Sequence, residues 1–220
     1  MTQTNPAQNS SAVLDARSLG FAEDFVTPGD TLRDAREQAV SLGLETISNG
    51  AATALRFLTR LVGARAVVEV GTGTGVSGLA IFEGMGSEGI ITSIDPEPER
   101  QAAARREFQA ARIASNRFRL IAGIPLEVLP KLRDGAYDMV FVNGDKLEYG
   151  EYVGQALRLL RHGGVVVINN ALWKNLVADP SNDDDETLII REALSAVAET
   201  EEFTPLLLPL GDGLLAAIKA

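Results

Sequence analysis

Hydrophobic residues recur in short runs through the middle of the chain. The runs cover residues 66–70, 90–94, 118–121, 139–142 and 165–168, and longer amphipathic stretches separate them. Runs that are apolar on both faces are typical of strands buried in a parallel sheet, and the stretches between them are long enough to be right-handed helical crossovers. The pattern therefore predicts a doubly wound, Rossmann-like α/β sheet.

The pattern changes at both ends of the chain. Residues 31–62 carry apolar positions at a helical period, which predicts two leading helices. Residues 1–30 are polar except for an apolar stretch at 21–26, so we expect a tail and a docking segment ahead of one domain at 31–220. The apolar runs 203–208 and 214–218 are joined too closely for anything but an antiparallel hairpin. The predicted sheet thus has seven strands, mostly parallel, with an antiparallel C-terminal hairpin.

The amino-acid composition excludes some classes of ligand and binding partner. The chain has 220 residues, a formal net charge of -10 and no cysteine, which excludes disulfides and thiolate metal sites. The acidic balance argues against nucleic acids and anionic membranes, because phosphate binding depends on clustered Lys and Arg. A neutral or cationic small molecule fits better. No apolar run approaches the ~20 residues of a membrane helix, and residues 1–11 lack the features of a signal peptide, so we expect a cytoplasmic protein.

A glycine-rich turn follows the first predicted strand. Gly71, Gly73 and Gly75 alternate with Thr72 and Thr74, and a helical stretch begins directly afterwards. Glycines allow a tight turn and let a ligand lie against the main chain and the helix N-terminus. A ligand site is one interpretation of this turn, and a strand-to-helix connection without a ligand is the other.

Two acidic residues indicate which ligand the turn would bind. Asp95 ends the second predicted strand, where a carboxylate can accept hydrogen bonds from both hydroxyls of a ribose, although it could instead cap the next helix. Glu69 lies two positions before Gly71. A carboxylate there would repel a pyrophosphate and attract the ammonium of a methionine moiety, unless a nearby Lys or Arg neutralises it. These features favour S-adenosylmethionine over a dinucleotide.

Longer motifs carry a resemblance to a known family. They are VEVGTGTGVS at 68–77, the strand end at 94–95, YDMVFVNGDK at 137–146, ALRLLRHGG at 156–164 and NNALW at 169–173. In these segments the chain resembles class I S-adenosylmethionine-dependent methyltransferases, specifically the bacterial branch of the catechol O-methyltransferase family, and the resemblance extends over about residues 32–219. It implies the following cofactor-binding residues: Ile47, Glu69, Gly71, Thr72, Gly73, Ser77, Asp95 and Ile124.

Each of these residues has an implied role. By the resemblance, Glu69, the glycine-loop backbone and Ser77 hold the methionine end of the cofactor, and Asp95 holds the ribose. Ile47 falls on a main-chain segment that lies over the cofactor. Ile124 follows the third strand, where the family packs residues against the adenine, and Pro125 takes a position that is polar in the family.

The resemblance also raises the question of a metal ion. Similar enzymes hold a divalent cation with an acid at the end of the fourth strand and with an acid and an Asn at the end of the fifth. The corresponding residues here are Asn143, Asn169 and Asn170. Magnesium is normally bound through one or two carboxylates. We therefore predict no tightly bound metal, and expect the three amides to orient a substrate hydroxyl or carbonyl directly, with Asp145 beside them.

Two residues are candidates for the chemistry at the acceptor. Lys146 matches the position where the family has a lysine near the acceptor hydroxyl, and it is our candidate base if its pKa is lowered by burial or by a cationic neighbour. A solvated lysine that opens a helix is the alternative. Trp173 is a candidate wall for an aromatic acceptor, and packing is the alternative role for its side chain.

The sequence thus predicts an S-adenosylmethionine-dependent O-methyltransferase that acts on a small acceptor, with aromatic molecules among the candidates. A catalytically silent module that binds the cofactor is the second hypothesis, because amides replace the family's acids. A nicotinamide-dependent dehydrogenase is the third, and Glu69 and the terminal hairpin argue against it. The apolar stretch at 21–26 further suggests a homodimer.

Overall fold

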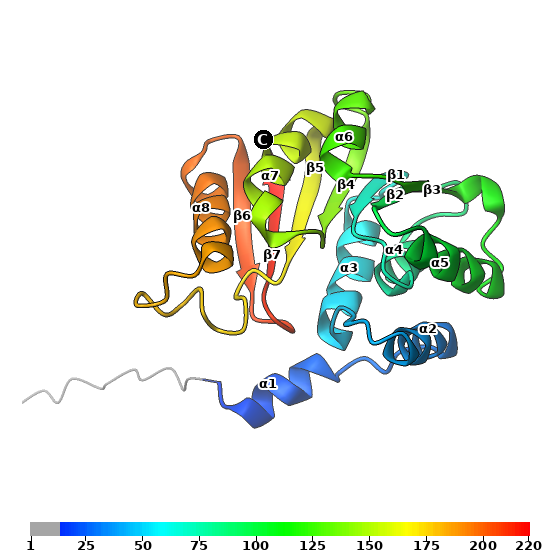
Figure 1. The fold of residues 1–220 in the computed structure, drawn as a ribbon, viewed down its shortest axis with the longest axis horizontal. Helices are drawn as coiled ribbons and strands as arrows, with labels where there is room; N and C mark the ends of the chain where they lie inside the picture. Colours follow the sequence, from blue (N-terminus) through cyan, green and yellow to red (C-terminus); the bar gives the residue numbers. More distant parts are fainter. Residues whose placement is uncertain (1–13) are drawn as a thin grey trace, which may run out of the picture.

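The computed structural model of the chain describes residues 14–220, so the predicted tail at 1–13 lies outside the described residues. Figure 1 shows a single twisted sheet with helices on both sides. The seven strands follow the order β3-β2-β1-β4-β5-β7-β6. Their bounds are Ala66–Val70 for β1, Ile90–Asp95 for β2, Phe118–Ala122 for β3, Tyr137–Val142 for β4, Leu160–Asn169 for β5, Phe203–Leu208 for β6 and Leu214–Lys219 for β7.

The pairing of the strands confirms the predicted fold class. The first five strands pair in parallel, and β7 runs antiparallel to both β5 and β6. The sheet is therefore mostly parallel and ends in an antiparallel hairpin. Because the carboxyl ends of β1, β2, β4 and β5 meet at one edge, the loops that follow them are brought together there.

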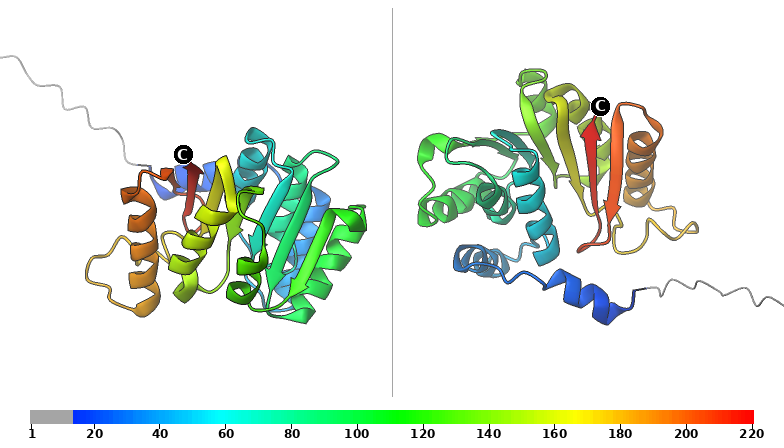
Figure 2. Two further views of the ribbon diagram at one scale, coloured as in Figure 1. Left: turned by 90° about the horizontal axis from the view of Figure 1, so that it is seen from above. Right: turned by 180° about the vertical axis from the view of Figure 1, so that it is seen from behind.

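Helices cover the two faces of the sheet in separate layers. Alternate strand residues contribute to two hydrophobic clusters, as expected for buried strands. One cluster packs against α2 (Asp30–Ser41), α3 (Asn49–Leu61), α4 (Val76–Gly84) and α5 (Pro98–Ala110). The other packs against α6 (Pro125–Val128), α7 (Tyr149–Leu159) and α8 (Asp185–Glu199). The two further views in Figure 2 show these layers from above and from behind.

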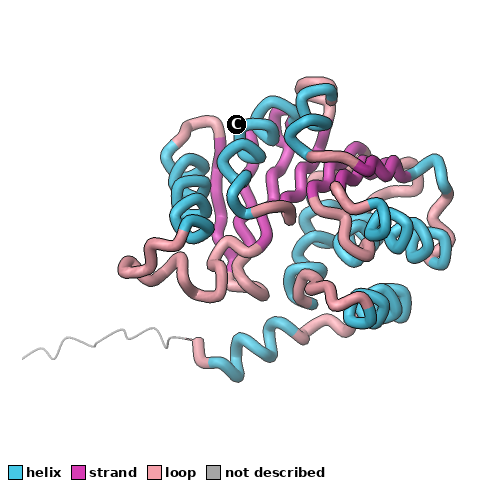
Figure 3. Tube along the Cα trace, viewed as in Figure 1, coloured by secondary structure: helices cyan, strands magenta, loops and turns pink. Residues whose placement is uncertain are grey.

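Shorter elements complete the architecture. Three 3-10 turns, η1 (Ser115–Arg117), η2 (Leu129–Lys131) and η3 (Lys146–Glu148), lie between the main elements. Figure 3 shows the long loop after β5 beside the turn that joins β6 to β7. In the described part of the chain, no helix is long and apolar enough to cross a membrane.

An additional helix, α1 (Ala16–Glu23), lies within the predicted docking segment, where the sequence analysis predicted no helix. None of its residues is buried, and Phe21 and nearby Phe25 are 71% and 74% exposed. Glu23 nevertheless ties α1 to the rest of the protein. One of its carboxylate oxygens accepts from the backbone N–H of Gly50 at 2.6 Å and the other from that of Gly211 at 2.9 Å. The short helix thus rests on polar contacts rather than on a packed apolar face.

Candidate functional site

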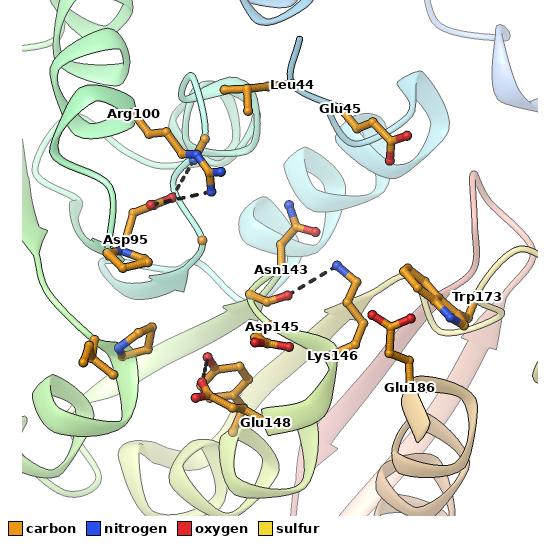
Figure 4. A pocket seen from close by; sticks show the side chains of 17 residues that line it. Leu44, Glu45, Asp95, Arg100, Asn143, Asp145, Lys146, Glu148, Trp173 and Glu186 are labelled. Atoms are coloured by element: carbon orange, nitrogen blue, oxygen red, sulfur yellow. Dashed lines mark hydrogen bonds and ion pairs between the residues drawn. The ribbon is translucent and has the colours of Figure 1, made fainter. Parts of the chain in front are cut away.

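A cavity of about 740 Å³ opens at the carboxyl edge of the sheet. Figure 4 shows it from close by, with Asp95 and Arg100 on one side and Lys146, Trp173 and Glu186 on the other. Its walls come from the loops after five different strands and from the segment between α2 and α3. The predicted site residues in its walls are Gly71, Gly73, Asp95, Ile124, Asn143, Asp145, Lys146 and Trp173.

The remaining predicted residues lie outside the cavity lining: Ile47, Glu69, Thr72, Ser77, Asn169 and Asn170. The walls also include polar residues that the sequence analysis did not single out: Glu45, Arg100, Glu148, Tyr152 and Glu186. These five residues lie on helices or their approaches and belong to none of the motifs. Only their spatial arrangement identifies them.

The glycine loop makes the close turn that its sequence predicts. Gly71, Gly73 and Gly75 have φ angles of 89°, 52° and 88°, in the left-handed region that favours glycine. The backbone of Gly71 also passes very close to the next strand end. A Cβ at Gly71 would lie 2.7 Å from the carbonyl carbon of Asn143, whereas a Cβ at Gly73 would meet nothing within 4 Å. The two glycines are therefore required for different reasons.

This difference predicts a graded effect of alanine substitution on stability. Gly73→Ala should cost about 1 kcal/mol, because only the left-handed backbone is disfavoured. Gly71→Ala should cost about 3 kcal/mol or more, because the methyl group also overlaps the Asn143 carbonyl. Urea unfolding of both variants measures the difference. Equal losses of stability would show that close packing at Gly71 has no role.

Asp95 sits where the glycine loop meets the end of β2. One carboxylate oxygen accepts from the backbone N–H groups of Thr72 and Gly73, at 2.9 and 3.1 Å. The other accepts from the N–H of Glu97 at 3.0 Å and lies 3.9 Å from an Arg100 nitrogen. Asp95 is only 2% exposed, yet it lines the cavity. Its carboxylate can therefore stabilise the loop and still face a ligand.

Glu69 lies beneath the glycine loop, in a small polar cluster. The pairing of β1 with β2 sets Glu69 opposite Ser93. The Ser93 hydroxyl donates to one Glu69 oxygen, and the Ser77 hydroxyl donates to the other at 2.5 Å. Burial raises the pKa of Glu69 to about 7, although the two serine hydrogen bonds oppose the shift. The carboxyl group can therefore change its charge near neutral pH.

The raised pKa of Glu69 predicts a pH dependence of stability. The unfolded chain releases this proton above its ordinary value of 4.5, whereas the folded protein keeps it up to about 7. Raising the pH through this window thus favours the unfolded state, and the free energy of unfolding should fall by about 3 kcal/mol in total. Urea unfolding between pH 5 and 8 measures this fall. The free energy of unfolding of Glu69→Gln should not fall over this pH range. If it falls as steeply as in the wild type, groups other than Glu69 cause the pH dependence.

The segment between α2 and α3 closes one side of the cavity. Leu44 and Glu45 line it, but the side chain of Ile47 is buried in the core at 3% exposure. The guanidinium of Arg36 holds this segment by donating to the carbonyls of Ile47 and Ser48, at 2.6 and 3.0 Å. Any contact of Ile47 with a ligand would therefore involve its main chain.

At the opposite side, amide side chains form a continuous chain of hydrogen bonds. The Asn169 side-chain nitrogen donates to the side-chain oxygens of Asn143 and Asn170, at 2.9 and 3.0 Å. The Asn170 side-chain nitrogen in turn donates to Asp212 at 3.0 Å. An amide N–H₂ group thus stands between the two oxygens that a cation would otherwise bring together. Among the described residues, no group of three His, Cys, Asp or Glu side chains is arranged to hold a metal ion.

Lys146 lies between this amide chain and an aromatic wall. Its Nζ donates to the carbonyl of Gly144 at 3.3 Å and lies 5.4 Å from the centre of the Trp173 ring. Burial lowers the pKa of Lys146, while the carboxylates of Asp145 and Glu186 oppose the shift. A partly desolvated lysine is in its neutral form, which can accept a proton, more often near neutral pH than a solvated lysine is.

Comparisons with known proteins identify the family of this chain. A family model described as O-methyltransferase matches residues 28–220. A Mycobacterium ulcerans protein named as an O-methyltransferase is 42% identical over 219 residues, which is 99% of this chain and 96% of that protein.

Solved structures with the same fold include two that are informative. A Corynebacterium glutamicum protein has a TM-score of 0.84 and 29% identity, and covers 91% of this chain and 94% of its own. The O-methyltransferase TomG of Streptomyces achromogenes, which takes part in tomaymycin synthesis and was solved with S-adenosylmethionine, has a TM-score of 0.81 and 26% identity. This match covers 91% of this chain and 94% of TomG.

Proposed function

Because this chain belongs to the O-methyltransferase family, we propose that it binds S-adenosylmethionine in the cavity at the sheet edge and transfers the methyl group to a hydroxyl of a small acceptor, without a bound metal ion. One observation carries the proposal. The cavity is continuous from Asp95 and the glycine loop to Lys146 and Trp173, so a nucleoside end and an acceptor end share one space.

The cofactor half of the proposal rests on four features. Asp95 would accept hydrogen bonds from the ribose hydroxyls, and the backbone of Gly71 and Gly73 would lie along the methionine end. Ile124, which is half-exposed in the cavity wall, would contact the adenine. Glu69 would act from beneath the loop, through the charge that it can acquire near neutral pH.

The acceptor half rests on Lys146 and the residues around it. The bound cofactor supplies an electrophilic methyl carbon. The acceptor oxygen would bond to this carbon as the carbon–sulfur bond breaks, and the electron pair of the broken bond would remain on sulfur. Lys146, as the neutral amine, would take the proton from the acceptor hydroxyl. The amide of Asn143 would orient the acceptor, and Trp173 would form an aromatic wall beside it.

The charge of the acceptor end favours neutral or cationic molecules. Its carboxylates outnumber the single amine of Lys146: Glu45, Asp145, Glu148 and Glu186. A panel that varies only in charge tests this preference, with dopamine as the cationic catechol, 4-methylcatechol as the neutral one and protocatechuate as the anionic one. We expect S-adenosylhomocysteine to form with the first two and more slowly with the third. No product with any acceptor, despite binding of S-adenosylhomocysteine, would instead support a silent cofactor-binding module.

The three amides do not suit a magnesium site. They offer no charge to replace the ion's hydration, and the Asn169 N–H₂ group is already directed at the other two oxygens. We therefore expect equal methylation rates with excess Mg²⁺ and with EDTA. The matched variant Asn143→Asp restores one carboxylate and should not make the rate depend on Mg²⁺. Loss of wild-type activity in EDTA, with recovery on adding Mg²⁺, would contradict the metal-free proposal.

The oligomeric state is a separate prediction. Phe21 of α1 and Phe25 just after the helix are exposed and lie edge to face, and this apolar pair supports the proposed homodimer. Gel filtration at micromolar concentration measures it, and elution as a monomer would refute the proposal.

A further inference from the structure

The loop after β5 holds an unfavourable backbone conformation. Asn170, Trp173, Lys174 and Asn175 have φ angles of 55°, 41°, 55° and 66°, and none of them is glycine. The left-handed region is disfavoured for such residues, so this conformation persists only if surrounding contacts impose it. The loop carries Trp173 into the cavity wall and begins with Asn170 of the amide chain. Whatever holds the loop therefore also places these two side chains.

Asp212, at the turn between β6 and β7, makes the contacts that hold this loop. One carboxylate oxygen accepts from the Asn170 side chain at 3.0 Å, and the other accepts from the backbone N–H of Lys174 at 2.5 Å. Its own carbonyl accepts from the N–H of Leu172 at 2.9 Å. A single residue thus engages the loop on both sides of Trp173.

The turn that carries Asp212 is itself fixed. The N–H of Gly211 donates to Glu23 of α1 at 2.9 Å, and the N–H of Gly213 donates to the carbonyl of Leu210 at 2.9 Å. Gly213 has a φ angle of 85°, and a Cβ there would lie 2.6 Å from the backbone nitrogen of Leu172. The hairpin tip is therefore packed directly against the loop.

From these contacts we infer that Asp212 is a positioning residue for the acceptor: it acts through Asn170 and the Trp173 loop to set the shape of the acceptor end. The inference rests on the proposed methyl transfer. Asp212 does not line the cavity, so its effect on the shape of the acceptor end passes through these two neighbours. Its charge also acts on Lys146, where it opposes the lowering of the pKa, and the KM and the Trp173 emission report on the shape rather than on this charge. Trp173 and Asp95 lie at opposite sides of the cavity, so cofactor binding should be independent of Asp212.

The test compares Asp212→Ala and Asp212→Asn with a matched control, Asp179→Asn. Asp179 lies on the same loop, and its carboxylate accepts from the backbone N–H and the hydroxyl of Ser181. Three readouts are used: the KM and kcat for 4-methylcatechol, the Kd for S-adenosylhomocysteine, and intrinsic fluorescence. Trp173 is the sole tryptophan of the chain, so its emission reports directly on this loop.

We expect Asp212→Ala to raise the KM for 4-methylcatechol about tenfold or more, because hydrogen bonds to a charged group are lost. The Kd for S-adenosylhomocysteine should stay within about twofold, and the emission of Trp173 should shift to the red as the loop opens to water. Asp212→Asn keeps one accepting oxygen and should fall between wild type and Asp212→Ala. Asp179→Asn should match wild type in every readout.

Two outcomes would overturn the inference. One is an unchanged KM and emission in both Asp212 variants. The other is a parallel loss of cofactor and acceptor affinity, which would show a general structural role. If Asp212→Ala does not fold, Asp212→Asn is compared with Asp179→Asn instead, and the same changes in KM, Kd and emission test the inference. Failure of the proposed function would be seen separately, because the wild type would then show no cofactor binding or no turnover. The fluorescence comparison still tests the position of Trp173 in that case, since it needs no turnover.

Discussion

Lys146→Met is expected to lower kcat by about 10²- to 10⁴-fold, the usual range for loss of a general base. The thioether is similar in length to the lysine side chain and can occupy the same space beside Trp173, but it cannot accept the proton from the acceptor hydroxyl. The Kd for S-adenosylhomocysteine should change little, since Lys146 lies at the acceptor end of the cavity. Initial rates at saturating cofactor, together with calorimetric titration, measure both quantities.

Two further variants test whether Lys146 acts by removing a proton or only through its positive charge. Lys146→Arg keeps a positive charge that cannot be removed at accessible pH, so it should be as inactive as Lys146→Met. Lys174→Met is the matched control, because the Lys174 Nζ also lies over the Trp173 ring, at 4.6 Å, but outside the cavity lining. It should retain nearly full activity. A Lys146→Arg variant with wild-type kcat would exclude proton removal by this residue.

Asp95→Ala is expected to weaken binding of S-adenosylhomocysteine by about 10²- to 10³-fold. Two hydrogen bonds from the ribose to a charged carboxylate would be lost, each contributing about 1.5–2 kcal/mol. Part of the loss would come from the glycine loop, because Asp95 also accepts from the N–H groups of Thr72 and Gly73. Calorimetric titration measures the affinity, and thermal unfolding of the free protein reports the loop contribution separately.

The control for Asp95 is Glu99→Ala. Glu99 is an exposed acid in the first turn of α5, near Arg100 but outside the cavity lining. Its removal changes the net charge equally and should leave the affinity within about twofold, as expected for an exposed charge. If Asp95→Ala binds S-adenosylhomocysteine as tightly as the wild type, the carboxylate does not contact the ribose and the cofactor must lie elsewhere.

The fold could be predicted closely because it depends on local patterns. Every predicted strand lies within an observed one, since a buried parallel strand must be apolar on both faces. Local chemistry also accounts for the start of α8, where the Asp184 side chain caps the helix and Asp185 and Glu186 lie in its first turn. The helix α1 was missed because it is short and buries nothing, so its residues carry no strong apolar period.

Residues of the candidate site could be predicted only where their position in the fold depends on residues close to them in the sequence. The glycine loop and Asp95 follow directly from their strand ends, and both are in the cavity wall. Glu45 and Glu186 reach the same cavity from different helix approaches, and no sequence spacing connects them. The conformation of the Trp173 loop depends on Asp212, which is 42 positions away from Asn170. Contacts at such separation leave no local signal in the chain.

The contact between Glu23 and Gly211 joins residues 188 positions apart, and it has a consequence for where the working unit begins. The match to the family model starts at residue 28, after α1 has ended. A version trimmed to that boundary would keep every strand and every cavity residue, but it would lose the carboxylate that holds the hairpin tip. Because Glu23 holds the turn that carries Asp212, we expect the trimmed version to show the same rise in the KM for the acceptor as the Asp212 variants. A shortened protein that keeps this contact has to begin ahead of α1.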